Sequence, residues 1–177
     1  MLKITTLFRA CTFSAILFST LAPPVFADSA EIMVGFSPEG SAQTLVLDTI
    51  NSAQSSIRMM AYSFTDPDIM KALANASKRG VDIRIVIDEN GNTSAASREA
   101  IKTMRLFNIP LRIDGDFAIQ HDKVIIVDET TVQTGSYNYS RSAAKKNSEN
   151  VIVLSNVPDI ASQYLEHWQD RWDRGHE

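Results

Sequence analysis

The order of apolar and polar residues along the chain predicts strands and helices in alternation. Short runs rich in Val, Ile and Met, either alternating or continuously apolar, are typical of strands. These runs span residues 31–36, 56–63, 81–88, 109–114, 118–128, 131–137 and 150–155. Longer segments with apolar residues three and four positions apart predict helices. These segments span residues 41–53, 95–107 and 158–174, and a further one opens at Thr65 and ends at Gly80.

Strand and helix segments that alternate over short loops favour an α/β layered domain, in which helices flank a mixed β-sheet. The helix at Thr65 begins with a capping signal, Thr65-Asp-Pro-Asp68, which places a proline in its first turn. The sequence contains neither an internal repeat nor a linker, so we expect residues 28–177 to form one domain. A chain of that size buries roughly two-thirds of its unfolded surface.

Residues 1–27 have the pattern of a secretory signal peptide. Lys3 and Arg9 precede an apolar run at residues 10–22, and a small residue, Ala27, ends the expected cleavage site. The run is shorter than the ~20 residues of a membrane span. Cys11 precedes most of it, which disfavours a lipoprotein anchor. We expect cleavage near Ala27 and a periplasmic or secreted protein.

Cleavage would change both the thiol content and the charge of the chain. Cys11 is the one cysteine, so the mature chain would have neither a disulfide nor a thiol nucleophile. Lys3 and Arg9 are lost and no acidic residue is, so the net charge moves from −4 to −6. A nucleic-acid partner would therefore depend on a local basic patch, because the protein has no overall positive field.

The segment 118–128 combines an apolar strand pattern with charged side chains. Alternation along a strand places His121 and Lys123 on one face, about 7 Å apart, and Asp122 and Asp128 on the other. Because burying an unpaired ion is costly, these residues lie either at the solvent-exposed end of the strand or in a site where they bind a ligand.

Ser136 and Asn138 repeat this spacing at the end of the next predicted strand, just after Gly135. If the two strands are neighbours, an imidazole, an ammonium, a hydroxyl and an amide meet at one end of the sheet, where Gly135 lets the backbone approach a ligand. This set suits a phosphoryl group, because the donors and the cation neutralise its oxygens and the imidazole can attack phosphorus. Glu149, at the start of the following strand, is a candidate for orienting the His121 ring.

The residues from 121 to 138 read His-x-Lys-x4-Asp-x6-Gly-Ser-x-Asn. This spacing resembles the HKD signature of the phospholipase D superfamily, and the flanking segments 61–73 and 148–156 resemble that family too. With a signal peptide and a single motif, the chain is most similar to the small exported, EDTA-resistant bacterial endonucleases of the family. The resemblance covers essentially the whole mature chain.

The resemblance implies a mechanism. Family members use the motif histidine as a nucleophile that forms a phosphohistidine, and the histidine of a second motif as a general acid, without a metal or another cofactor. The residues that this assigns to the active site are His121, Lys123, Ser136 and Asn138, and Glu149 stays the candidate for orienting the His121 ring. Because this chain carries one motif, the resemblance also implies a homodimer in which each chain gives half of the site. Asp128 faces away from His121, so we assign it a structural role.

We therefore expect a metal-independent phosphodiesterase that cleaves DNA, with RNA as a second polymer, and has little sequence preference. A lipid phosphodiesterase or phosphatidyl transferase would use the same chemistry and is the alternative, although we find no loop suited to a membrane surface. A binding module without turnover is a third interpretation, which the complete motif disfavours. Arg141, Lys145 and Lys146 form a basic cluster that is either a track for a nucleic-acid backbone or a solvated helix face.

The closing helix carries aromatic residues and a histidine. Trp168 and Trp172 are four positions apart and in line with Tyr164, which predicts packing of the helix on the sheet rather than base stacking. His167 and His176 have no partner at metal-ligand spacing, so we expect no metal site there.

Overall fold

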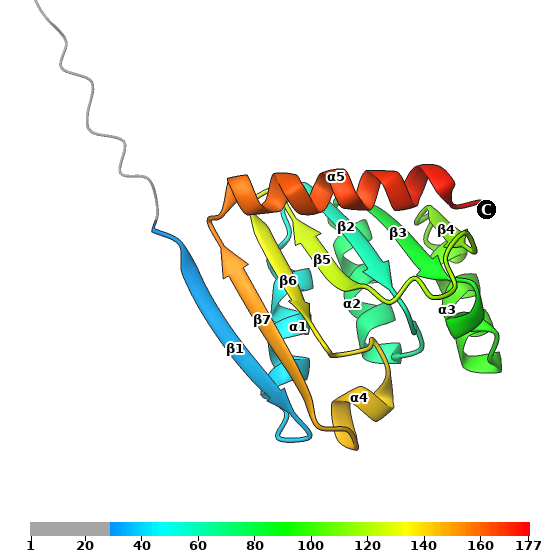
Figure 1. Cartoon of the computed structure of the whole chain (residues 1–177), viewed down its shortest axis with the longest axis horizontal. Coiled ribbons are helices and arrows are strands. Elements are labelled where there is room, and N and C mark those ends of the chain that lie inside the picture. The colour runs from blue at the N-terminus through cyan, green and yellow to red at the C-terminus, as the bar shows by residue number, and fades with distance from the viewer. Residues whose placement is uncertain (1–28) are drawn as a thin grey trace, which may run out of the picture.

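The computed structural model describes residues 29–177, and in this part of the chain seven strands form one mixed sheet in the order β1-β7-β6-β5-β2-β3-β4 (Figure 1). The predicted signal peptide lies outside the described residues. The strands are β1 (Glu31–Ser37), β2 (Ser56–Ala61), β3 (Asp82–Asp88), β4 (Leu111–Asp114), β5 (Lys123–Val127), β6 (Thr131–Gly135) and β7 (Glu149–Ser155). The helices are α1 (Ser41–Ser52), α2 (Pro67–Lys78), α3 (Ala95–Leu106), α4 (Arg141–Lys145) and α5 (Pro158–Arg174), with a short 3-10 helix, η1 (Asn90–Asn92), after β3.

Helices cover both faces of the sheet. The helices α1, α2 and α3 lie on one face, and α5 runs across the other (Figure 1). Side-chain alternation divides the core accordingly, because Met59 and Ile125 pack toward α1–α3 whereas Met60 and Val124 pack under α5 against Trp168. The predicted α/β layered architecture is confirmed.

The strand directions decide which residues meet. Strand β3 is parallel to β2 and β4, whereas β5 is antiparallel to β2 and β6, and β7 is antiparallel to β6 and β1. The carboxyl ends of β2 and β6 therefore lie at the same end of the sheet as the first residues of β5 and β7. The register places Ala61 opposite Lys123 and Gly135 opposite Val151.

The strand predicted at 118–128 is shorter in the structure, because β5 begins at Lys123. The backbone N–H of Gln120 donates to the buried carboxylate of Asp88, with 2.7 Å between the nitrogen and Oδ2, so it bonds a side chain instead of a neighbouring strand. The Asp122 carbonyl extends the ladder by accepting from the N–H of Tyr62 at 2.9 Å. His121 therefore lies just before the strand, and the prediction that it lies within the strand is wrong.

Strand β6 ends at Gly135 instead of continuing to residue 137, and the neighbouring backbone explains the glycine. Its φ is +149°, and a Cβ at this position would lie 2.3 Å from the carbonyl oxygen of Asn150. We expected Gly135 to make room for a ligand, whereas the group that it accommodates is the adjacent strand β7. Helix α4 was not predicted, because five residues are too few to show a helical period.

Candidate active site

The residues expected to act on a phosphoryl group meet at one end of the sheet. His121 and Lys123 stand at the start of β5, Ser136 and Asn138 follow β6, and Glu149 opens β7. Since β5, β6 and β7 are consecutive antiparallel neighbours, these positions adjoin one another. We refer to this part of the molecule as the His121 end of the sheet.

The His121 side chain is exposed and rests against a tyrosine. Its ring lies 4.6 Å from the ring of Tyr62, centroid to centroid, with the planes tilted by 56°. Tyr62 directly follows β2, the strand that pairs with β5, so the sheet register brings the two rings together. Sequence reasoning did not single out Tyr62. The signal for it was its position at the end of a strand, which becomes informative only once the pairing of β2 with β5 is known.

Lys123 is a buried cation beside this histidine. The residue is 5% exposed, and its Nζ donates to the backbone carbonyl of His121 at 2.7 Å. The same Nζ lies 5.1 Å from the centroid of the Tyr62 ring. Burial lowers the pKa of Lys123, and the carboxylates of Asp122 and Glu149 act in the opposite direction. A weakly solvated ammonium is well suited to bind a phosphoryl oxygen, because little hydration has to be removed.

Ser136 and Glu149 are joined by a short hydrogen bond. The Ser136 hydroxyl donates to Glu149 Oε2 at 2.6 Å and accepts from the backbone N–H of Asn150 at 3.1 Å. The other carboxylate oxygen of Glu149 accepts from Asn147 Nδ2 at 2.9 Å. Within residues 29–177 the expected hydrogen bond between Glu149 and the His121 ring is not present. In this chain Glu149 orients the Ser136 hydroxyl.

Buried tyrosines fix the segment that carries Asn138. Tyr139 donates to the buried Gln133 side chain at 2.8 Å, and its backbone carbonyl accepts from the N–H groups of Thr65 and Asp66. Burial raises the pKa of Tyr137 well above its ordinary value, so the phenol stays protonated. Within residues 29–177, the Tyr137 hydroxyl and Asn138 Oδ1 are buried without a hydrogen-bond partner.

Asp128 lies at the far end of β5 from His121. Its carboxylate accepts four hydrogen bonds of 2.8 Å, from the backbone N–H groups of Gln54, Ser55 and Ser56 and from the Ser55 hydroxyl. Burial raises the pKa of Asp128, but these hydrogen bonds outweigh it and hold the pKa below its ordinary value. Asp128 therefore braces the connection from α1 to β2, away from the reacting groups.

The basic cluster of Arg141, Lys145 and Lys146 is exposed and borders the His121 end. Arg141 and Lys145 begin and end α4, whose N-terminus is capped by the hydroxyl of Ser140, two residues beyond Asn138. The cluster therefore follows closely, along the chain, the segment that carries Ser136 and Asn138.

The aromatic residues of α5 pack as predicted. Trp168 is buried, its Nε1 donates to the Met59 carbonyl at 3.2 Å, and its ring stacks on Trp172 with 5.3 Å between centroids. His167, which the sequence left without a partner, lies 3.3 Å from Asp122 Oδ2 through its Nε2. Among residues 29–177 no three His, Cys, Asp or Glu side chains are arranged to hold a metal ion. No helix in this range is both long enough and apolar enough to span a membrane.

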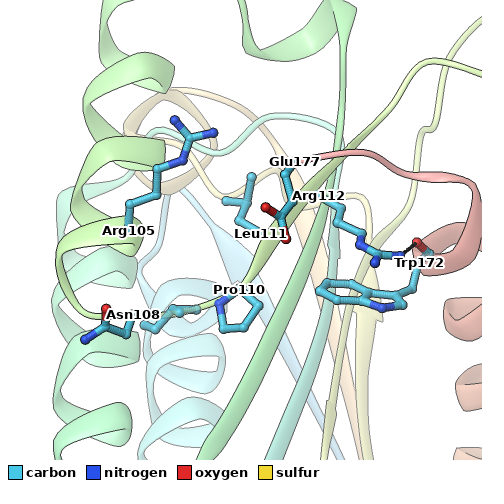
Figure 2. A pocket seen from close by; sticks show the side chains of 8 residues that line it. Arg105, Asn108, Pro110, Leu111, Arg112, Trp172 and Glu177 are labelled. Carbon is cyan, nitrogen blue, oxygen red and sulfur yellow. Dashed lines mark hydrogen bonds between the residues drawn. The ribbon is translucent and has the colours of Figure 1, made fainter.

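A cavity of about 570 Å³ lies at the opposite end of the sheet (Figure 2). It is bordered by Leu111 and Arg112, the first residues of β4, by Arg105 on α3 and by Trp172 on α5. The Arg112 guanidinium lies 4.4 Å from the Trp172 ring centroid and donates to the Trp172 carbonyl at 2.7 Å. This cavity is separate from the His121 end.

Comparison with known proteins agrees with this geometry. The family described as cardiolipin synthase, PLD-like domain, matches residues 46–172. A phospholipase D of Rickettsia conorii is 34% identical over 142 residues, which cover 80% of this chain and 70% of the relative. A mitochondrial cardiolipin hydrolase of Mus musculus is 28% identical over 133 residues, which cover 75% of this chain and 59% of the relative.

A solved structure is still more similar. The crystal structure of Nuc, a phospholipase D family member from Salmonella typhimurium, superposes with a TM-score of 0.83 and 60% sequence identity, over 84% of this chain and 97% of that chain. With the HKD residues gathered at one end of the same fold, this protein belongs to the phospholipase D superfamily and is a phosphodiester hydrolase.

Proposed function

We propose that this protein is a metal-independent endonuclease that hydrolyses DNA, and RNA as a second polymer, with little sequence preference. The observation that carries the proposal is the pairing of an exposed imidazole, His121, with a buried ammonium, Lys123, on one short segment. An exposed nucleophile can reach a phosphodiester of a polymer, and a buried cation beside it can stabilise the charge that develops on the phosphoryl oxygens.

In the proposed reaction, a ring nitrogen of His121 attacks phosphorus in line with the leaving oxygen. The new N–P bond forms as the P–O bond breaks, and the leaving oxygen takes a proton from a second, protonated histidine. Water then attacks the phosphohistidine, gives its proton to that second histidine, and releases the phosphate monoester. Lys123 and Asn138 bind the phosphoryl oxygens in both steps. The hydrogen bond from Ser136 to Glu149 keeps the serine hydroxyl in a fixed orientation beside them.

We propose that the second histidine is His121 of another copy of this chain, in a two-fold symmetric dimer. An apolar strip on β1 supports this. Val34 and Phe36 are 60% and 53% exposed on the face of β1 that points away from α1, and β1 ends with Ser37 opposite Glu149 of the site. A second copy that covers this strip would stand beside the His121 end.

Random mixing of parent and inactive chains tests this sharing. We expect an equal mixture of parent and His121→Asn chains, refolded together, to have about a quarter of the activity of the same total amount of parent protein, because only parent–parent dimers hold both histidines. A monomeric enzyme would keep about half.

Exposed cations favour a nucleic acid over a lipid. Arg141, Lys145 and Lys146 stand beside the site and can follow a phosphate backbone. The chain also resembles the exported single-motif endonucleases, and we propose that it is exported after cleavage near Ala27. A lipid phosphodiester is the second candidate, because relatives of this chain are named phospholipase D and cardiolipin hydrolase.

The experiment is cleavage of plasmid DNA by the purified mature protein in excess EDTA, beside His121→Asn. His176→Asn is the matched control, because His176 is exposed and bonds Ile113 through its backbone. We expect the parent and the control to cleave and His121→Asn to be inactive. Cleavage that requires added Mg²⁺ would overturn the phosphohistidine mechanism. If DNA and RNA both stay intact while cardiolipin vesicles are hydrolysed, the lipid candidate is correct.

A further inference from the structure

His121 precedes β5, so the hydrogen bonds of the sheet do not fix its position by themselves. The segment 119–122 is irregular, and side-chain contacts hold it in place. Gln120 is 2% exposed, and its backbone N–H is bound to Asp88. The Asp122 carbonyl accepts from Tyr62 on one side of His121, and Lys123 Nζ holds the His121 carbonyl itself.

The side chain of Asp122 adds a link from this segment to α5. Its Oδ2 accepts from Gln120 Nε2 at 2.9 Å and lies 3.3 Å from His167 Nε2. An open cavity of about 300 Å³, bordered by Asp122, Gln163, Tyr164 and His167, lies at the surface where the segment and the helix meet. Beside it, the hydrogen bond between Asp122 and His167 ties the segment directly to α5.

The helix end of this tie is anchored to the sheet. Trp168, the residue after His167, is 2% exposed and donates from its indole nitrogen to the Met59 carbonyl of β2. The same strand carries Tyr62 just beyond its end, against the His121 ring. The helix and the ring are therefore placed with reference to the same strand.

We propose that His167 is a positioning residue for the reaction: by holding Asp122, it fixes the segment 119–122 so that the His121 ring is aimed in line at phosphorus. The inference rests on the proposed phosphodiesterase function and assigns to it a residue outside the HKD motif. Misplacing a reacting group by about 1 Å can cost on the order of 100-fold in rate, so a small displacement of His121 is enough to lower kcat.

The test compares kcat and KM of the mature protein on bis(p-nitrophenyl) phosphate and on plasmid DNA for the parent, His167→Ala, His167→Gln and Gln163→Ala. Gln163 borders the same cavity from the same helix but bonds Asp159 instead of Asp122, which makes it the matched control. We expect His167→Ala to lower kcat about tenfold or more with KM nearly unchanged, since substrate binding depends on other groups. His167→Gln, whose amide can reach Asp122, should restore most of the loss, and Gln163→Ala should match the parent.

A double-mutant cycle keeps the test decisive if His167→Ala also lowers Tm. Asp122→Ala and His167→Ala combined should reduce kcat no further than the larger single effect, because both remove one tie. Independent losses that multiply would overturn the proposal, and so would a kcat for His167→Ala equal to that of the parent.

Hydrogen exchange separates this inference from the proposed function. In His167→Ala we expect faster exchange of the Gln120 amide, which bonds Asp88, and unchanged exchange in β6. If the parent cleaves neither substrate, the proposed function fails, and the exchange result still decides whether α5 holds the segment. Unchanged exchange at Gln120 would show that it does not.

Discussion

The ammonium of Lys123 donates a hydrogen bond of 2.7 Å to the backbone carbonyl of His121, two residues earlier in the chain. The cation and the imidazole thus belong to one small unit, in which the charge that would bind the phosphoryl group also helps to hold the nucleophile. If Lys123 binds the phosphoryl group as proposed, it has two roles at once, and its replacement should affect both.

Lys123→Met should abolish most of the activity without unfolding the protein. Losing a preorganised charge that binds the phosphoryl oxygens is expected to lower kcat by at least about 100-fold. Because burial disfavours the charged form of Lys123, removing it should leave Tm unchanged or slightly higher. Steady-state kinetics on bis(p-nitrophenyl) phosphate and thermal unfolding measure the two effects. An exposed lysine of the basic cluster, in Lys146→Met, is the control on the same small substrate.

The lowered pKa of Lys123 also has a consequence for stability. The unfolded chain binds this proton more tightly than the folded one, so the free energy of unfolding should rise as pH increases toward the ordinary lysine pKa of about 10.4. In urea unfolding experiments, the free energy of unfolding should rise less between pH 7 and pH 9 for Lys123→Met than for the parent. An identical rise would mean that Lys123 is solvated in the folded protein.

Asp128→Asn should weaken the fold and spare the chemistry. The amide cannot accept all four hydrogen bonds that the carboxylate accepts, so we expect a loss of about 1–3 kcal/mol in the free energy of unfolding at pH 7. Because the folded-state pKa of Asp128 is depressed, its contribution is complete above the ordinary value of about 3.9 and disappears as pH falls through the folded-state pKa. The difference between parent and variant should therefore shrink in acid. A large loss of kcat at 20 °C with the fold intact would contradict this role.

Val34→Lys should separate the proposed dimer and remove activity together. A charge in the middle of the apolar strip on β1 cannot be buried between two copies at low cost. We expect light scattering to report a monomer and kcat to fall in proportion to the dimer lost. Leu106→Lys is the matched control, because Leu106 is 72% exposed on α3, away from this strip. A monomeric variant with full activity would show that one chain holds a complete site.

Neutralising the basic cluster should weaken binding of polymers alone. In the triple variant Arg141→Gln, Lys145→Gln, Lys146→Gln, we expect KM for DNA to rise several-fold and to depend less steeply on salt, because fewer counterions are released on binding. Kinetics on bis(p-nitrophenyl) phosphate should be unchanged, since that substrate does not reach α4. Lys71→Gln on α2 serves as the control. Equal effects on both substrates would place these side chains within the chemistry itself.

The architecture, and the meeting of the expected site residues at one end of the sheet, could be predicted because they depend on local patterns. Strand and helix positions follow from apolar periodicity, and the spacing of His121 and Lys123 relative to Asn138 is a property of the sequence. What could not be predicted depends on contacts between distant segments. The backbone N–H of Gln120 bonds the Asp88 side chain instead of a neighbouring strand. The ring of Tyr62 contacts His121 only because β2 pairs with β5.

The hydrogen-bond partner of Glu149 could not be predicted from the sequence for the same reason. A carboxylate at the start of a strand has several reachable donors, and only the register of β6 against β7 selects the Ser136 hydroxyl over the His121 ring. Likewise, the link from His167 to Asp122 joins residues 45 positions apart, which no spacing rule connects.

The close approach of β7 to Gly135 separates the signature into two kinds of position. Gly135 is needed because a side chain there would collide with the Asn150 carbonyl, and Asp128 is needed because it braces the connection before β2. Both positions therefore serve the fold. His121, Lys123 and Asn138 are the positions that we propose for the reaction itself. We therefore expect a relative that keeps the glycine and the aspartate but has lost the histidine to fold well and to lack activity, and a genome survey that weights all positions of the signature equally would count it among the active enzymes.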